Sequence, residues 1–249
     1  MEGGNFLKNS QIIILGICIA VATIASSVIL SGGFLKVMKF TREQISVTGS
    51  ATKEIRSDYI VWTGQLARRE VDLKTAYKGL QEDLAKVKEH LKSKGVSENE
   101  TMASQVMTET VYKKNEKGND TNDIEGYRLT QNVEIKSNDV DKITMVSRES
   151  TELIDQGVQF NSSAPEYFYT KLDELKIEML AKATDNAKQR AESMTKATGN
   201  KIGFMRSARM GVFQITPSTS TDVSDWGMND TTSLDKKVMA VVTVSFAIE

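Results

Sequence analysis

Hydrophobic residues follow three different spacings along this chain, and each spacing predicts a different kind of element. The first is a continuous apolar run near the N-terminus, where no charged residue occurs for 27 positions between Lys8 and Lys36. A bilayer core of about 30 Å needs about 20 apolar helical residues, and this run supplies them. It predicts a transmembrane anchor at 10–31, after a short tail at 1–9 and before a juxtamembrane linker at 32–42.

The second spacing is helical. From 73 to 91 the apolar side chains recur every three or four residues, between an expected N-cap at Asp72 and an expected C-cap glycine at Gly95. This pattern predicts a helix over 72–94 with one packed face and one lysine-rich, solvated face. A second, shorter helix is predicted over 139–155.

The longest predicted helix outside the apolar run starts with a capping-box-like Thr-Lys-Leu-Asp at 170–173 and ends at Gly199. It spans about 28 residues, or about 42 Å. Ala183, Ala187 and Ala191 form a stripe of small side chains along one face. Such a stripe permits close packing, either against a sheet of the same chain or against a neighbouring subunit.

The third spacing is the alternation of apolar and polar residues that is typical of β-strands. Strands are predicted near 45–50, 59–67, 101–113, 126–136, 158–160 (extended by Tyr167 and Tyr169), 202–213 and 238–248. The element order is therefore β-β-α-β-β-α-β-α-β-β. This order predicts an α+β domain over 43–249, with mainly antiparallel sheets packed by one long and two shorter helices.

The net charge of this domain gives no indication of a nucleic-acid partner. Residues 43–249 contain 28 basic and 32 acidic side chains, so no basic excess points to nucleic acid. The single cysteine, Cys18, lies inside the apolar run, and the domain therefore has neither a disulfide nor a cysteine-based metal site or nucleophile. We expect no cofactor.

Motifs for catalysis are equally scarce. The single histidine, His90, lies late in the 72–94 helix and is interpreted as a surface or flanking residue, because no cysteine or second histidine accompanies it. There is no phosphate-binding glycine loop and no nucleophile-elbow or zinc-protease motif. The aspartate pairs at 120–123 and 222–225 lack the glycine and terminal glutamate of an EF-hand loop. We predict no catalytic residue and no metal site.

One polar segment contains apolar side chains that a monomer would expose. Met210 and Phe213 lie at its start, and Trp226 and Met228 lie near its middle. Tryptophan and methionine are enriched in the cores of protein interfaces. These four residues and the alanine stripe are therefore our candidate interface. The alternatives are a loop that folds back so that Trp226 covers the core of its own domain, and a small-ligand site.

The N-terminal run itself has two further interpretations. A cleaved secretory signal is the alternative to an anchor, with Thr23 to Ala25 as a weak cleavage site, but the apolar run continues through Leu30. A buried core helix is the third. Lys36, Lys39 and Arg42 follow the run, and this charge bias favours a cytoplasmic C-terminal domain, although a large domain can translocate regardless of a few charges.

Four segments form a family pattern by their order and spacing. They are Val-Thr-Gly within 45–54 followed by Ser57-Asp58, Gly-Tyr within 124–133, the Ala-rich stretch 183–191, and the exit from Gly199 to Gly203. Together they resemble the SIMPL-domain proteins, which include bacterial periplasmic immunogenic proteins, over about 43–249. The chain departs from the family at Gly49-Ser50-Ala51, where many members have a second glycine. Many members are also secreted behind a cleaved signal.

The resemblance implies an extracytoplasmic α+β protein that assembles into rings or cages, has been linked to envelope and oxidative stress, and has no accepted catalytic site. From it we expect a single-pass inner-membrane protein, with its C-terminal domain in the periplasm and lipid contacts through 10–31. We expect a non-enzymatic homo-oligomer. A ligand- or client-binding, chaperone-like module is the alternative, and a hydrolase that uses scattered carboxylates is a third hypothesis.

Overall fold

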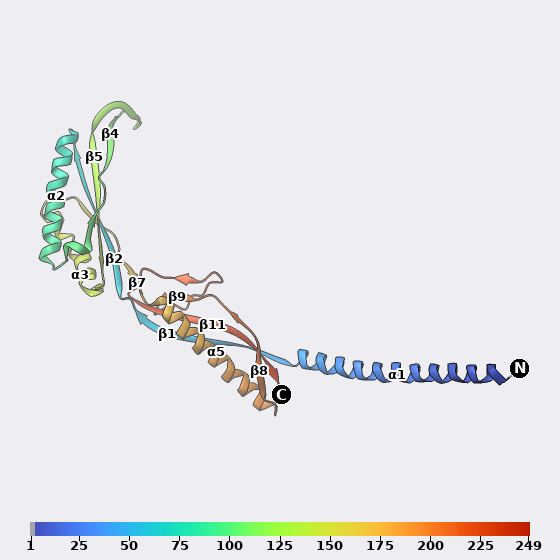
Figure 1. The fold of residues 1–249 in the computed structure, drawn as a ribbon. Coiled ribbons are helices and arrows are strands. Elements are labelled where there is room, and N and C mark those ends of the chain that lie inside the picture. The colour runs from blue at the N-terminus through green and yellow to red at the C-terminus, as the bar shows by residue number, and fades with distance from the viewer. Residues whose placement is uncertain (1–2) are drawn as a thin grey trace. The chain divides into compact units, whose positions relative to one another are not determined.

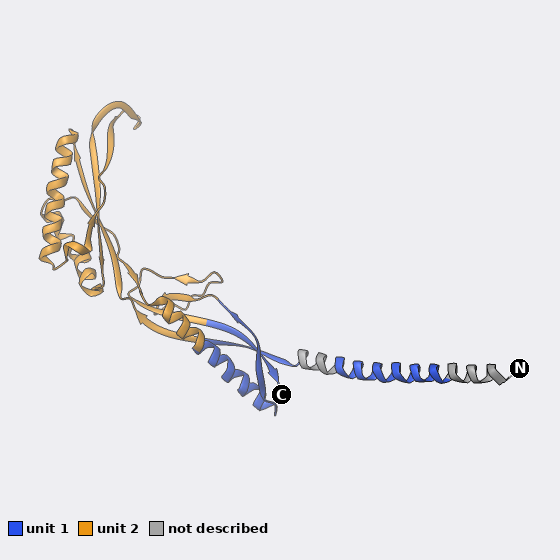
Figure 2. Ribbon diagram, viewed as in Figure 1, with its two compact units in different colours: residues 1–50, 182–211, 241–249 blue, residues 51–181, 212–240 orange. Residues whose placement is uncertain are grey.

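The computed structural model describes residues 3–249, and for 3–13 and 35–42 it describes the backbone only. The chain divides into two compact units (Figure 2). Unit 1 contains 1–50, 182–211 and 241–249, and unit 2 contains 51–181 and 212–240.

Helix α1, Gly3–Arg42, is the N-terminal element of the described chain (Figure 1). Its apolar part, Ile14–Phe34, is long enough to cross a membrane, and none of that part is buried against the rest of the chain. This length and composition suit an anchor or a signal sequence, and the absence of burial shows that this part is not the buried core helix. The stretch 32–42, predicted as a linker, is helical. The predicted tail at 1–9 lies partly outside the described residues.

Unit 2 contains a six-stranded sheet in the order β3-β5-β2-β6, with β4 beside β5 and β7 beside β2. All of its strand pairs are antiparallel. The strands are β2 (Tyr59–Glu70), β3 (Thr101–Ala103), β4 (Met107–Lys114), β5 (Asp120–Ser137), β6 (Phe160–Ser162) and β7 (Glu166–Phe168).

Helix α2, Leu73–Ser93, packs against β2 and β5 of this sheet (Figure 1). The side chain of Asp72 accepts a hydrogen bond from the amide of Thr75, and Gly95 has a φ of 78°, so both predicted caps are confirmed. The apolar stripe of α2 and the inward residues of the strands form one core around the fully buried Trp62.

Two details of this helix were wrong in the sequence interpretation. His90 is buried, not superficial, because it stands three residues after the buried Val87 and so falls on the same helix face. Leu73 and Tyr77 are exposed although their spacing placed them on the packed face.

The segment predicted as one helix over 139–155 is two helices, α3 (Val140–Glu149) and α4 (Glu152–Asp155). The break follows Ser150, which is fully buried and whose hydroxyl donates to the carbonyl of Ser147. Such bonds from serine to the backbone compete with the helical pattern. A 3-10 turn, Glu98–Glu100, precedes β3.

The second sheet has five strands in the order β1-β11-β9-β10, with β8 also paired to β11. They are β1 (Gln44–Arg56), β8 (Ile202–Met210), β9 (Gln214–Pro217), β10 (Met228–Asn229) and β11 (Asp235–Ile248). The pairs of β11 with β8 and β9 are antiparallel, whereas β9 and β10 are parallel. The predicted strand over 202–213 ends at Met210, and the polar segment that contains Trp226 includes the short strand β10.

The part of helix α5, Leu172–Ala197, that carries the alanine stripe belongs to unit 1 (Figure 2). Ala183, Ala187 and Ala191 are fully buried. A Cβ added at Gly49 of β1 would lie 2.7 Å from the Cβ of Ala187, so helix and strand are in direct contact. The stripe therefore packs against the sheet of its own chain. The α+β class, the antiparallel sheets and the predicted order of the main elements are confirmed.

Candidate functional site

An exposed tryptophan stands at the tip of a tight turn in unit 2. The amide of Gly227 donates to the carbonyl of Ser224 at 3.1 Å, and Gly227 has a φ of 84°, a conformation that favours glycine. The amide of Trp226 donates to the Ser224 hydroxyl at 3.3 Å. The side chain of Trp226 is 94% exposed. The alternative that this loop folds back to cover its own core is therefore wrong.

The base of this turn is held by a buried glutamine. Gln214, in β9, is 6% exposed. Its amide nitrogen donates to the carbonyl of Ser224 at 2.6 Å, and its amide oxygen accepts from the Ser224 backbone at 3.3 Å. The parallel pairing of β10 with β9 fixes the other end of the turn, with Met228 opposite Gln214. The exposure of Trp226 is thus built into a well-supported loop.

The other predicted interface residues differ in their accessibility. Met210, the last residue of β8, is 58% exposed. Phe213 and Met228 are half-buried. The three alanines of α5 are buried within the chain, so we remove them from the candidate interface. Near Trp226, the exposed Val223 adds an apolar side chain that sequence reasoning did not single out.

A buried lysine is the second unusual group. Lys236 is 3% exposed, and its Nζ donates to the carbonyl of Tyr167 at 2.6 Å and to the carbonyl of Asp230. Burial lowers the pKa of Lys236 below its ordinary value, although the negative charge of Asp230 opposes this. Burial raises the pKa of Asp230, but hydrogen bonds from Thr232 and Ser233 and the charge of Lys236 hold it below its ordinary value.

Lys236 lines a cavity of about 70 Å³. That volume is well below the roughly 300 Å³ at which small-molecule pockets begin. The lysine therefore acts as a structural bridge between β7 and the segment before β11. Sequence reasoning missed it, although a signal was present, because Lys236 stands in phase with the buried Val238 and Ala240 of the same strand.

Comparison with models of protein families shows which family the chain belongs to. The family model described as SIMPL, a protein of unknown function (DUF541), matches residues 45–246. The chain belongs to the SIMPL family. No curated protein matches it.

Two of the SIMPL-like motif positions now have physical roles. Gly49 provides the close contact between β1 and α5. Asp58 connects the β1–β2 turn to the start of α5, because its carboxylate accepts from the amide of Thr170 at 2.7 Å and from its hydroxyl at 2.8 Å. Neither residue is part of a reactive cluster. Both residues hold neighbouring elements of this chain together.

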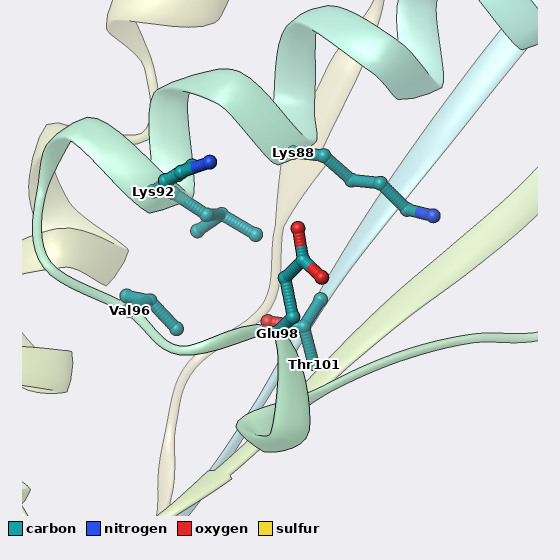
Figure 3. Close-up of a pocket in the computed structure, with 6 residues that line it drawn as sticks. Lys88, Lys92, Val96, Glu98 and Thr101 are labelled. Atoms are coloured by element: carbon teal, nitrogen blue, oxygen red, sulfur yellow. The ribbon is translucent and has the colours of Figure 1, made fainter.

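A shallow hollow of about 260 Å³ lies beside the C-terminal end of α2 (Figure 3). Lys88 and Lys92 stand one helical turn apart at its rim, and the side chain of Glu98 lies below the helix between them. The mixed charges specify no particular ligand. Among residues whose side chains are described, no group of three His, Cys, Asp or Glu side chains is placed to hold a metal ion.

Proposed function

We propose that this SIMPL protein is a non-enzymatic, membrane-anchored subunit that assembles with copies of itself into a ring or cage at the cell envelope, where it serves in the response to stress. The observation that carries the proposal is Trp226, which is 94% exposed on a turn that Gln214 holds in place. A tryptophan fixed in solvent is the kind of residue that dominates protein interfaces.

The membrane helix supports the same proposal. The apolar side chains of Ile14–Phe34 are not covered by the chain itself, so a bilayer is the environment that would bury them. Subunits held in one membrane have a high effective concentration, and a modest contact between them is then enough for assembly. With the N-terminus inside, the domain would lie on the extracytoplasmic side, as the family resemblance implies.

Mass measurement of the full-length protein in detergent tests the assembly. Light scattering after size exclusion should give a discrete multiple of the 27.6 kDa chain, after subtraction of the micelle. A monomer at micromolar and higher concentrations would refute the proposal.

Labelling in whole cells tests the orientation. In a Cys18→Ala background, a cysteine introduced at the exposed Asn119 should react with a membrane-impermeant maleimide once the outer membrane is permeabilised. Protection from the reagent until the inner membrane is lysed would place the domain in the cytoplasm.

The exposed Trp226 also favours a second candidate function, which is the binding of unfolded client proteins. A client-binding module would slow the aggregation of an unfolded test protein at stoichiometric amounts, and Trp226→Ala would remove that protection. No effect on aggregation would leave self-association as the use of this surface.

A further inference from the structure

Strand β8 has a free edge with an unusual set of exposed residues. It pairs with β11, and no strand in the described part of the chain pairs with its other edge. Met210 lies opposite Val242, and Arg209 lies opposite Thr243, so the two side chains project from opposite faces at the same rim. Ala208, also exposed, shares the face of Met210 and leaves space beside it.

Strand β8 and the Trp226 turn carry charges of opposite sign. Residues 200–215 contain Lys201, Arg206 and Arg209 and no acidic side chain. Residues 216–235 contain four aspartates and no basic side chain. Asp225 and Arg209 form no ion pair with any residue whose side chain is described. One segment therefore presents exposed positive charge, and the other presents exposed negative charge.

We propose that the Trp226 turn of one chain docks onto the free edge of β8 in a second copy. Trp226 packs against Met210 in the space beside Ala208, and Asp225 pairs with Arg209. This proposal deepens the proposed function, on which it rests, by naming the two surfaces that meet.

Each surface has a charged residue next to a large apolar residue in the sequence. Asp225 and Trp226 are consecutive at the tip of the turn, and Arg209 and Met210 are consecutive at the rim of β8. An aromatic ring against a methionine sulfur is a favourable contact, and a carboxylate beside a guanidinium adds specificity. Because the hydrogen bond from Gln214 to the carbonyl of Ser224 already holds the turn, little conformational freedom is lost on docking.

Two different surfaces meet in this contact, so it is heterologous. A heterologous contact repeats from copy to copy and closes into a ring when the rotation permits. Pairing of β8 with β8 of a second copy would instead bring together two strands that carry basic and no acidic side chains, and like charges disfavour it. A membrane surface with anionic lipids is disfavoured as the partner of Trp226 because the turn itself is acidic.

Disulfide cross-linking of the full-length protein in detergent tests which surfaces meet. In a Cys18→Ala background, Asp225→Cys and Arg209→Cys are made as two separate proteins and co-purified from cells that express both. Oxidation with copper phenanthroline should yield dimers from the mixture and none from either variant alone. The chain with both substitutions should yield a ladder of covalent oligomers. Dimers from one variant alone, or none from the mixture, would overturn the proposal.

Mass measurement of surface variants tests the energetics. Trp226→Ala should raise the concentration at which the assembly dissociates by about tenfold or more. Val71→Ala is the matched control, because Val71 is 79% exposed but lies outside both surfaces, and it should leave the assembly unchanged. Arg209→Asp and Asp225→Arg should each dissociate the assembly, and the double reversal should restore it.

Tryptophan fluorescence gives an independent measurement. The chain has two tryptophans, and Trp62 is buried, so quenching by iodide reports Trp226. Quenching should fall on assembly. This contact would be refuted if every variant kept the mass of the wild-type assembly and Trp226 of the assembled wild type stayed open to iodide. Self-association would then still stand. A monomeric wild type would refute both proposals.

Discussion

Substitution of Gly49 by alanine should destabilise the domain, because it adds a methyl group where β1 and α5 already touch. The new Cβ would lie 2.7 Å from the Cβ of Ala187, against 3.4 Å or more for an ordinary contact, and it would also meet the carbonyl oxygen of Ala183 and the amide nitrogen of Ala187. Two of these atoms belong to the helix backbone, so no side-chain rotation relieves the overlap.

The size of the effect follows from the movement that relief requires. Helix α5 must withdraw from β1 by about 0.7 Å or more, and a gap of 0.5–1 Å forfeits a quarter to a half of the dispersion energy of the contacts that it opens. Overpacking of a tight core costs about 1–3 kcal/mol, and backbone contact places this site near the upper end. The melting temperature should fall by about 4–12 °C.

Thermal unfolding of the full-length protein in detergent, followed by far-ultraviolet circular dichroism, measures this loss. Gly211→Ala is the control, because its Cβ would lie 3.3 Å from the carbonyl oxygen and 3.6 Å from the Cβ of Val241, and the cost should stay within about 0.5 kcal/mol. If Gly49→Ala melts with the wild type, helix and strand are not in contact at this point and the reasoning fails.

Three further measurements test other parts of the structure. Lys236→Met should cost about 1–3 kcal/mol in thermal unfolding, because two carbonyl groups lose their donor, and an unchanged melting temperature would show that the lysine does not bridge them. Gln214→Ala should release the turn at Ser224, so that limited proteolysis cleaves 218–230 about tenfold faster or more. Cleavage at the wild-type rate would show that Gln214 does not hold the turn. The pKa of Glu100 is lowered by hydrogen bonds to its carboxylate, of which the bond from Ser137 has the largest effect. The stability due to Glu100 is therefore fully present above its ordinary pKa of 4.5 and is lost as the pH falls through the lowered value, and Glu100→Gln should flatten this acid loss in a pH series of melts.

Sequence patterns were sufficient to predict the elements that are determined by the local spacing of apolar residues. The apolar run predicts α1 because bilayer thickness sets its length, and the stripe with its two caps predicts α2 because capping groups satisfy the ends of a helix. The family also follows from sequence alone, since the SIMPL family model matches residues 45–246.

Tertiary structure alone decided which faces are covered. By sequence the alanines of α5 suited either a sheet or a subunit, and the contact with Gly49 decided for the sheet. By sequence Trp226 suited either a buried or an exposed position, and the structure exposes it. Lys236 and Gln214 received their roles from partners far away in the chain or beyond a turn. The physical reason is common to these cases: periodicity determines which side chains share a face, whereas the partner of that face depends on segments that folding brings together.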